Sequence, residues 1–565
     1  MSGLSTIINI ATSGVLAQQT AIAATAENVA NITTPDFSRR EVNFQSDPVP
    51  GQFSGVTADV TRAGANQFLQ SSALSSVSET NALSSVADAL SRITGTLSDS
   101  GDGLSFSSQI DTAIASLAEL NASPASATAQ IEAITNLDAA FDAFARTRSA
   151  ITAEADQALL GFDFNIDRAN QLLSEISTLN NQIGTGDNGG AQDALASSLS
   201  ELSGLISIST NFDEIGRATV TTGAGRVLAN ANGFAGLVFS ENDLSLGVTA
   251  ISQTGPGLDP SNQPLIVNNI ANEISGGSIG GALALLTDAL PTISQLISSV
   301  EADFAATLNN AASGNSNFPA SSILSASIIA QDAAFQNLSG QTSLARIDDN
   351  GFLLGRVDID FDAQSLTIDN AGPISFVPTL DGLVSALDGI VGLSANLNGD
   401  LLSIEDSNGN GLSLANDSAG FSSLFGFNPI ISSNGNGFEV NDTIRANPNE
   451  LAAGRIDLSG VSIGELVTGA NNGQGAATLF EAGRVQSENL ANAIGQIGSL
   501  SVDATNRAAI AQAFNEEVSA RLIEESGVNL EEELSNLILF QRSFNANARI
   551  LSVADELYQS VLALI

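Results

Sequence analysis

The stretch NLEEELSNLILFQRSFNANARILSVADELYQSVLALI, residues 529–565, has an apolar side chain at every seventh position. The row consists of Leu530, Leu537, Phe544, Leu551, Tyr558 and Ile565. Asn529 is a good N-cap for a helix starting here. The three glutamates that follow favour the positive end of the helix dipole, with Glu532 at the capping-box position. A sustained seven-residue repeat predicts a helix that supercoils against a partner.

The first thirty residues carry a similar repeat. Its row is Met1, Ile8, Val15, Ile22 and Val29. The pattern ends in NVANITTPDFSRR, residues 28–40, where Asn31 can adopt a left-handed cap and Thr34 is disfavoured in a helix because proline follows it. Chain ends usually fray, so two regular repeats at opposite ends suggest that the ends pair as a coiled coil. Two amphipathic helices packed on one globular core are the alternative.

Composition limits the classes of function. The chain has 565 residues, of which 43% are hydrophobic and 14% charged, enough for several domains with cores of their own. The net charge is −43 and all 18 basic residues are arginines, so the chain repels nucleic acid and anionic membranes. The N-terminus lacks the features of a secretory signal peptide, and no unbroken apolar run reaches the length of a membrane span. We therefore expect neither nucleic acid nor a membrane as a partner.

No residue pattern indicates an active site or a cofactor. The chain has no cysteine and no histidine, which excludes disulfides, Ser-His and Cys-His nucleophiles and soft metal sites. Residues 406–417 have Asp and Asn at EF-hand offsets, but the flanking apolar alternation favours an Asn-Gly turn in a hairpin. Asp358, Asp360 and Asp362 alternate with apolar residues, as on the solvated face of a strand. A hydrolase that uses two acidic residues stays open, although no pair is indicated.

Arg39 and Arg40 follow the break in the first repeat. In a chain this acidic, salt links to carboxylates of the same chain or of other subunits are favoured over phosphate contacts. Arg542 and Arg549 lie seven residues apart on the last helix, off its apolar row, and similar subunit contacts are expected of them.

The two ends resemble those of the axial proteins of the bacterial flagellum, the rod, hook and hook-associated proteins. The N-terminal signature of that group, roughly N-x-A-N-x-x-T-P-G-Y-x-R, is matched at Asn28, Ala30, Asn31, Thr34, Pro35 and Arg39, with Asp36 replacing the glycine and Phe37 the tyrosine. The C-terminal signature is matched from Ser526 to Leu530 and at Glu533, Leu537, Gln541, the run Asn545 to Arg549 and the run Ala554 to Glu556. The resemblance covers about a fifth of the chain.

The middle of the chain alternates between helical and strand patterns. Residues 66–205 read as helical, and a coiled-coil seam is expected at Phe162, Ala169, Leu172, Ile176, Leu179 and Ile183. Strand patterns follow, then a helix that Pro291 kinks or breaks, then a second β-rich part. In that part GRVDIDFDAQSLTID predicts a half-buried strand, TLDGLVSALDGI a short helix and DLLSIEDSNGNGLSLAND a hairpin. This order is similar to that of the hook-associated protein 1 family.

We therefore expect an α+β multidomain fold. Its terminal helices would pair as a coiled coil, and β-rich outer domains would be inserted into a long antiparallel helical domain. The predicted segments are an axial helix and turn (1–65), a helical domain (66–205, 279–315 and 451–525), two β-rich inserts (206–278 and 316–450) and a second axial helix (526–565).

The resemblance implies a non-enzymatic structural protein, without cofactor, that joins hook to filament outside the cell. It implies export without a cleaved signal peptide, a ring-like homo-oligomer, and contacts with hook protein, the second junction protein and an export chaperone at the C-terminal region. The assembly residues would be the motif Asn28, Asn31, Thr34, Pro35, Phe37 and Arg39 and the two apolar rows. The alternatives are another axial protein of hook or rod type, or a secreted acidic adhesin or hydrolase.

Overall fold

The computed structural model describes residues 2–34, 37–46, 55–63, 66–97, 105–185, 189–252, 266–467 and 473–562. The chain is 59% helix and 18% strand, which confirms the predicted α+β class. It divides into two compact units, each built from separate stretches of sequence. The first unit comprises Met1–Ala89, Asp156–Asp288 and Val502–Ile565, and the second comprises Leu90–Ala155 and Ala289–Ser501.

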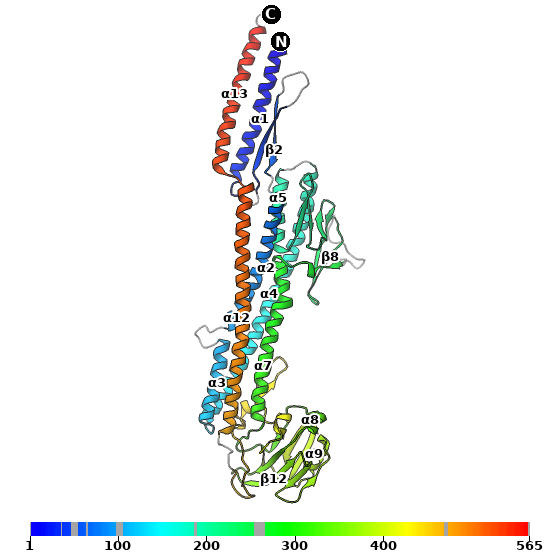
Figure 1. Ribbon diagram of the computed structural model, residues 1–565, viewed down its shortest axis with the longest axis vertical. Coiled ribbons are helices and arrows are strands. Elements are labelled where there is room, and N and C mark those ends of the chain that lie inside the picture. The colour runs from blue at the N-terminus through cyan, green and yellow to red at the C-terminus, as the bar shows by residue number, and fades with distance from the viewer. Residues whose placement is uncertain are drawn as a thin grey trace. The chain divides into compact units, whose positions relative to one another are not determined.

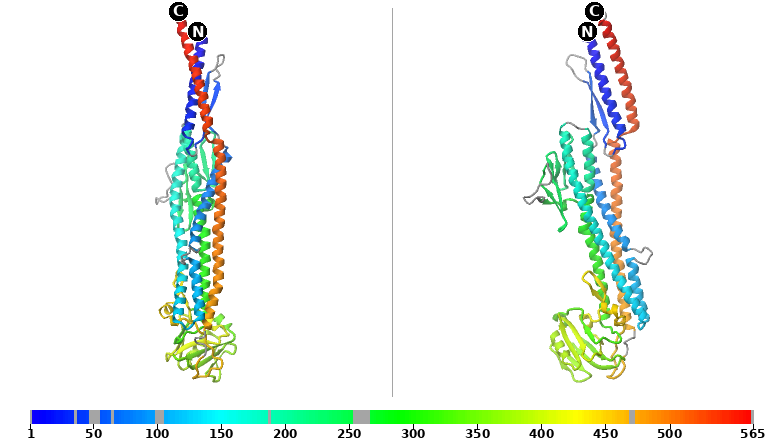
Figure 2. Two further views of the ribbon diagram at one scale, coloured as in Figure 1. Left: turned by 90° about the vertical axis from the view of Figure 1, so that its left-hand side faces the viewer. Right: turned by 180° about the vertical axis from the view of Figure 1, so that it is seen from behind.

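In the first unit the two ends of the chain form one helix pair. Helices α1 (Ser2–Ala30) and α13 (Leu530–Leu562) lie side by side and run antiparallel, with N and C at the same end of the pair (Figures 1 and 2). A hairpin of β1 (Arg40–Ser46) and β2 (Val56–Arg62) lies beside them, and the ring of Phe44 meets that of Phe540 edge-on at 5.9 Å. The predicted pairing of the terminal helices is therefore present within a single chain.

Helices and two small sheets form the rest of the first unit. Three long helices, α2 (Gln67–Leu97), α4 (Ala127–Thr185) and α12 (Gln474–Ser526), contribute to both units, and α5 (Gly189–Leu205) belongs to the first. One sheet has the order β3-β4-β5-β6 and the other β7-β8-β9. These strands are Ser209–Phe212, Ala218–Thr221, Val227–Asn230, Gly233–Phe234, Leu237–Ser240, Ser245–Thr249 and Ile266–Asn269. All six residues of the predicted seam on α4 are buried in the core that these elements share.

The helix that follows the second sheet is interrupted where the sequence predicts. After a 3-10 turn (Ala271–Glu273), α6 (Gly277–Ala284) leads into a π-helical stretch (Leu285–Ala289) and then into α7 (Leu290–Ser313). Pro291 has no amide hydrogen and clashes with the preceding turn, which accounts for the irregular hydrogen bonding there.

The second unit contains α3 (Phe106–Ala122), α7 and the larger β-rich part. Its sheets have the orders β10-β16-β15, β14-β13-β12-β11-β17 and β18-β19. The strands β10 to β19 are Ile323–Ser325, Gln341–Ile347, Leu353–Asp360, Ser365–Ile368, Ile374–Ser375, Leu393–Asn398, Leu401–Asp406, Gly411–Ala415, Ile431–Ser433 and Phe438–Val440. The short helices are α8 (Asp332–Gln336), α9 (Leu380–Asp388), α10 (Phe421–Phe425), α11 (Asp442–Ala446) and a 3-10 turn (Pro448–Glu450).

Of the three predictions for this part, the helix is confirmed, the strand is confirmed only as far as Asp360, after which a turn leads into β13, and the hairpin is wrong. In β12, Val357 and Ile359 are buried while Asp358 and Asp360 lie on the other face, and α9 forms as predicted with Thr379 as its N-cap. The hairpin predicted around the Asn-Gly turn is not formed, because β16 pairs with β15 and β10 whereas β17 pairs with β11. The turn therefore connects two sheets.

The last predicted helical segment, 451–525, becomes helical only at Gln474. Before that, Ile456, Leu458 and Val467 pack with the β11 residue Ile347 and with Leu353 of β12 in a small apolar core. The helical pattern of the sequence therefore resumes later than we predicted.

Four helical asparagines bind the backbone of a neighbouring segment through both atoms of their side-chain amides. In three of them Nδ2 donates to a carbonyl at 2.8–2.9 Å while Oδ1 accepts from an amide at 2.7–2.9 Å. These are Asn170 with Leu237, Asn180 with Ala218, and Asn309 with Ile431 and its neighbour Ile430. The fourth, Asn28, belongs to the site described below. A helix that holds a strand in this way fixes the strand's register as well as its position.

Two segments are long and apolar enough to cross a membrane, by length and composition alone: Gly3–Ala30 and Gly277–Ser313. Core helices of soluble proteins meet the same criterion. Both segments bury one face against other elements, with Ala21 of α1 and Ile293 of α7 fully enclosed. Neither segment contains an unbroken apolar run of that length, so the sequence pattern did not indicate them.

Candidate assembly interface

Small side chains form the face of α1 that meets α13. The buried positions of α1 are Ala11, Gly14, Ala17, Ala21, Ala24, Thr25 and Asn28. A Cβ atom at Gly14 would lie only 2.9 Å from the side chain of Asn547 on α13, so the two helices approach closely there. Close packing of small residues gives a helix pair more dispersion contact than bulky side chains at that separation would allow.

The register of this contact differs from the predicted one. The apolar row of α1, Ile8, Val15, Ile22 and Val29, is only partly buried, and the buried row Gly14, Ala21 and Asn28 lies one residue earlier. The row of α13 on this side is Glu533, Phe540, Asn547 and Ala554, which we call the inner row. Glu533 and Asn547 meet α1, Phe540 meets Phe44 of the adjoining hairpin, and Ala554 is buried. The predicted residues Leu537, Phe544 and Leu551 are half-buried beside it, and Leu530 and Tyr558 are exposed. Both rows repeat every seven residues, so the period alone does not distinguish them.

A polar centre lies where the end of α1 meets the start of α13. The amide Nδ2 of Asn28 donates to the Arg40 carbonyl at 2.9 Å and to Glu533 Oε2 at 3.0 Å, while its Oδ1 accepts from the Arg40 amide at 2.7 Å. Asn28 and Glu533 are 1% and 2% exposed. Asn28 therefore joins α1, β1 and α13 in one buried group.

Arg39 binds the same carboxylate from the other side. Its Nε donates to Glu533 at 2.7 Å and its terminal nitrogen donates to Glu532 at 2.8 Å, while its backbone amide donates to the Ser526 carbonyl. Burial alone would lower the pKa of the Arg39 guanidinium, but the hydrogen bonds to Glu532 and Glu533 outweigh that effect and raise the pKa. The buried carboxylate is thus paired and hydrogen-bonded on both oxygens, as a buried charge requires.

Arg40 connects this centre to the helical body of the same unit. Its guanidinium is buried, 3.3 Å from Glu27 of α1 and 2.5 Å from Asp193 of α5, and 5.0 Å from the ring centroid of Phe37. Arg62 of β2 lies 3.3 Å from the same aspartate. The salt links expected for Arg39 and Arg40 are therefore made within one chain.

The other motif residues lie at the end of α1. Asn31 donates from its side chain to the Glu27 carbonyl and accepts from the Thr34 hydroxyl at 3.1 Å. Asn31 does not take the left-handed conformation predicted for it, since its backbone φ is not positive. Its side chain closes the helix end instead. Pro35 and Asp36 lie outside the described residues.

Sequence reasoning identified Arg39, Asn28 and the glutamates but not their connections. The sequence gives a weak indication that Glu533 is a site residue, because its carboxylate interrupts an otherwise apolar helix face at a position that a partner would bury. The sequence gives no indication that Asp193 is a site residue, because it lies in a helix 153 residues from Arg40.

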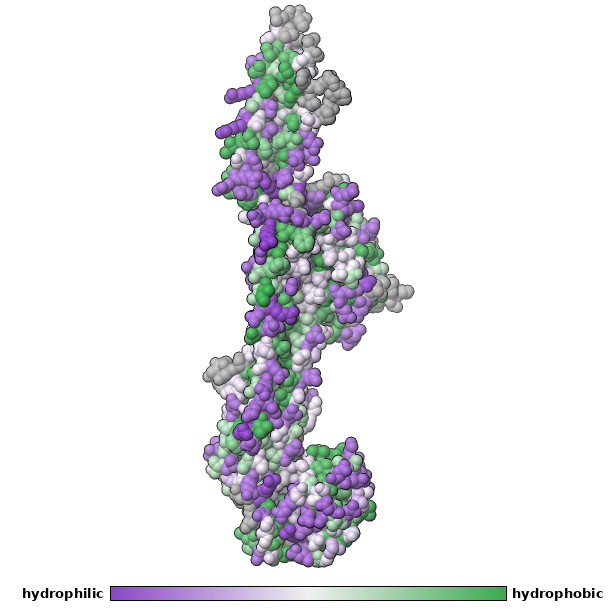
Figure 3. Space-filling model, viewed as in Figure 1, coloured by the Kyte–Doolittle hydropathy of each residue, from purple (hydrophilic) through white to green (hydrophobic). Residues whose placement is uncertain are grey.

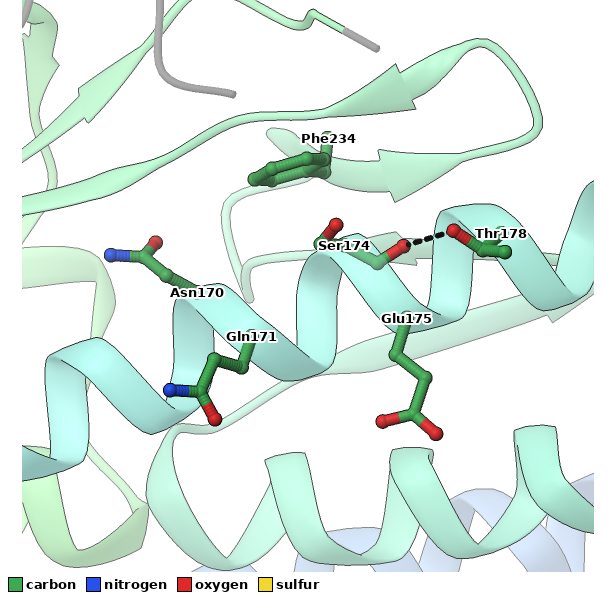
Figure 4. Close-up of a pocket in the computed structure, with 6 residues that line it drawn as sticks. All are labelled: Asn170, Gln171, Ser174, Glu175, Thr178 and Phe234. Carbon is green, nitrogen blue, oxygen red and sulfur yellow. Dashed lines mark hydrogen bonds between the residues drawn. The ribbon is translucent and has the colours of Figure 1, made fainter. Parts of the chain in front are cut away.

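The hollow on α4 is not a comparable site. It measures about 530 Å³ and is lined by Asn170, Gln171, Ser174, Glu175 and Thr178 of α4 and by Phe234 of β6 (Figure 4). The Asn170 amide is already bound to the backbone of Leu237 and Thr178 lies on the exposed side of the helix. In the described ranges no three acidic residues are grouped to hold a metal ion, and Asp406 of the EF-hand-like segment is bound to Arg346 and to the amides of Asn408 and Asn410.

Two family comparisons bear on this arrangement. The family described as "Flagellar hook-associated protein FlgK helical domain" matches residues 90–317. The family described as "Flagellar basal body rod FlgEFG protein C-terminal" matches residues 520–564, which include the whole of α13. The two matches support a FlgK-family flagellar hook-associated protein.

The same matches support a hook-associated structural protein of the bacterial flagellum, and this family implies assembly into the flagellum with hook and related proteins. Flagellar structural proteins of this family are not enzymes. Comparison with curated sequences gave no match. Among solved structures, the flagellar hook junction protein FlgK from Burkholderia pseudomallei is similar over 81% of this chain and 99% of its own, at 13% identity and a TM-score of 0.49.

Proposed function

We propose that this FlgK-family protein joins hook to filament through its terminal helix pair. In this proposal the pair packs against the pairs of neighbouring copies, stacks on hook subunits and receives the second junction protein. The observation that carries it is the position of the large apolar side chains. The two helices bury small and polar residues between them, and much of their apolar surface stays outside.

The exposed apolar residues occur on both helices of the pair. Leu16 of α1 is 58% exposed, and Leu539 and Val553 of α13 are 57% and 53% exposed. The space-filling view has apolar residues gathered over the helix pair (Figure 3). A monomer rarely exposes contiguous apolar surface of this kind unless it serves an interaction. The predicted rows Ile8 to Val29 and Leu530 to Tyr558 lie partly on this surface, so they are candidate contacts between chains.

The wider partners follow from the same proposal. A ring-like homo-oligomer would bury these apolar faces, because head-to-tail contacts between identical chains repeat from copy to copy, either in a closed ring or in a turn of a helical array. We also propose export through the flagellar route without a cleaved signal peptide. A cytoplasmic chaperone at the C-terminal region would cover α13 until assembly.

The test is electron microscopy of a strain from which this gene is deleted, with flagellin assayed in the medium. We expect hooks without filaments and flagellin lost to the medium. Absence of hooks would move the protein to the hook or rod, and normal flagella would overturn the proposal. Complementation with the full chain should restore filaments, whereas a chain lacking residues 530–565 should not, although the middle of that chain should still fold.

A further inference from the structure

Most arginines of this chain are paired with a carboxylate of the same chain. Thirteen of the 18 form ion pairs within the chain. Arg542 and Arg549, both exposed on α13, have no carboxylate partner among the described residues. Arg146 of α4 and Arg507 of α12 also have no ion pair among the described residues, but Arg542 and Arg549 both lie on the helix that the proposed function places between copies.

Charge is scarce on the helix pair away from the polar centre. Glu27, at the end of α1, is the only charged residue of that helix. Along α13 the charged residues after Glu533 are Arg542, Arg549, Asp555 and Glu556. In an assembly, the two positive groups on α13 of one copy can pair with the two negative groups on α13 of another copy.

Arg542, Arg549 and Glu556 occupy one face of α13, which we call the outer row. They are spaced by seven residues, and the row lies about 200° around the helix from the inner row, so it points away from α1. All three residues are exposed. Ile538 and Val553, 52% and 53% exposed, lie on the same face. A partner on this face would therefore cover apolar surface and meet charges at fixed intervals.

The order Arg-Arg-Glu discriminates between the possible offsets of two parallel copies. With no offset, each charge faces its own kind. With an offset of seven residues, Arg549 faces Glu556 but Arg542 faces Arg549. With an offset of fourteen residues, about 21 Å along the helix, Arg542 faces Glu556 and no like charges meet. Like charges placed opposite each other disfavour a register, as they do at the flanking positions of coiled coils.

We propose that Arg542 of one copy pairs with Glu556 of a neighbouring parallel copy displaced by fourteen residues along the helix axis, and that Arg549 disfavours the shorter offset. This inference rests on the proposed function, because it takes the terminal helices of neighbouring copies to lie alongside each other in the same direction. It adds the face, the residues and the displacement.

The first test uses the absence of native cysteine. A chain with Arg542→Cys and Glu556→Cys cannot close an internal disulfide, because fourteen helical residues separate the two thiols by about 21 Å and a disulfide needs Cα atoms within about 7 Å. Flagella isolated from cells carrying only this variant should give a ladder of cross-linked copies under mild oxidation. The matched variant Arg549→Cys with Glu556→Cys, also too distant to close internally, should give none. The reverse result would overturn the fourteen-residue offset.

The second test exchanges charges and does not depend on cross-linking. Arg542→Glu and Glu556→Arg should each reduce recovery of the protein in isolated flagella at least tenfold, and the double variant should restore it. Normal recovery of both single variants, with the wild type also present in flagella, would overturn this inference and leave the proposed function intact. Absence of the wild type from flagella would overturn the proposed function itself. Far-UV circular dichroism should be unchanged in all variants, because both positions are exposed.

Discussion

The side chain of Asn28 and the backbone of Arg40 exchange two hydrogen bonds, of 2.9 and 2.7 Å, across the end of the first helix. The amide group that donates to Arg40 also donates to Glu533. A carboxamide is needed here because the site calls for donors and an acceptor on the same side chain. A carboxylate of the same shape would supply acceptors alone.

Asn28→Asp should therefore open the helix pair. The substitution removes two donated hydrogen bonds and puts a second carboxylate beside Glu533, which should cost about 3 kcal/mol or more. Hydrogen exchange read by mass spectrometry should show faster exchange in peptides from α1 and α13. Asn9→Asp, on an exposed position of the same helix, is the control and should leave exchange unchanged. Equal protection in the two variants would contradict the role assigned to Asn28.

The two glutamates that bind Arg39 should differ in importance. The Glu533 side chain is 2% exposed and that of Glu532 is 53% exposed. Glu533→Gln leaves the Arg39 guanidinium without its buried carboxylate and should destabilise the helix pair by about 3 kcal/mol. Glu532→Gln removes a solvated ion pair and should cost less than about 1 kcal/mol. Thermal unfolding followed by circular dichroism should rank the variants in this order, and a larger effect at Glu532 would count against the assignment.

A disulfide can report the antiparallel pairing of the chain ends. The Cβ position of Gly14 lies 2.9 Å from the Asn547 side chain, so Gly14→Cys with Asn547→Cys places two thiols within bonding range. We expect an intramolecular bond in the purified monomer, seen as faster migration on non-reducing gels. The control Gly3→Cys with Asn547→Cys should not form it, since nothing lies within 4 Å of a Cβ at Gly3. Cross-linked dimers from the first variant would mean that the two helices pair between chains.

Substitution by alanine should have opposite effects on stability at two helical glycines. Gly161 in α4 has no atom within 4 Å of a Cβ, so Gly161→Ala should stabilise the first unit by about 0.5–1 kcal/mol through helix propensity alone. At Gly281 in α6 a Cβ would lie 2.6 Å from the carbonyl oxygen of Ala82, so Gly281→Ala should destabilise it despite the same propensity gain. Calorimetry of both variants would detect the opposite shifts. A loss of stability in Gly161→Ala would contradict the open space described there.

Acid should weaken the connection between the two outer sheets through Asp406. Burial alone would raise the pKa of this carboxyl, but the hydrogen bonds from Arg346 and from the amides of Asn408 and Asn410 outweigh that effect and lower it. A folded-state pKa below the unfolded value of about 3.9 means that the unfolded chain binds the proton more readily. The stability that Asp406 contributes is therefore present above about pH 4 and lost as the pH falls through its folded-state pKa.

The measurement compares the wild type with Asp406→Asn at several pH values. The variant should unfold at a lower temperature at pH 7, and the difference in unfolding temperature should narrow below about pH 4, because the unfolded wild type takes up a proton there. Asp400→Asn, on the neighbouring exposed turn, is the control and should change the unfolding temperature at pH 7 only slightly. If the difference in unfolding temperature between the wild type and Asp406→Asn stays constant down to pH 3, the lowered pKa of Asp406 is contradicted.

The helices and their pairing could be predicted from sequence because hydrophobic periods and caps are local. Asn529 does cap α13, accepting from the Glu531 and Glu532 amides, as predicted. The register could not be predicted. Gly14 and Ala21 carry little hydropathy signal, and the larger Val15 and Ile22 one position later dominate the pattern although they lie beside the contact.

The pairing of β16 and β17 could not be predicted for a different reason. The turn after Asp406 has the chemistry of a hairpin, but β17 pairs instead with β11, about seventy residues earlier in the chain. Nothing local distinguishes a turn within one sheet from a turn between two. The salt link from Arg346 to Asp406, which joins the sheets there, spans 60 residues. Asp193 of α5, the partner of Arg40, could not be predicted for the same reason, because it is also distant in sequence.

The hydrogen bond between Asn28 and Glu533 joins residues 505 positions apart. At synthesis rates of roughly 5–20 residues per second, about 25–100 s pass between the appearance of α1 and that of its partner. During that interval the first helix has no α13 against which to bury its face, and an isolated helix is marginal in water. The last helix to be synthesised therefore determines when the first can complete its folding.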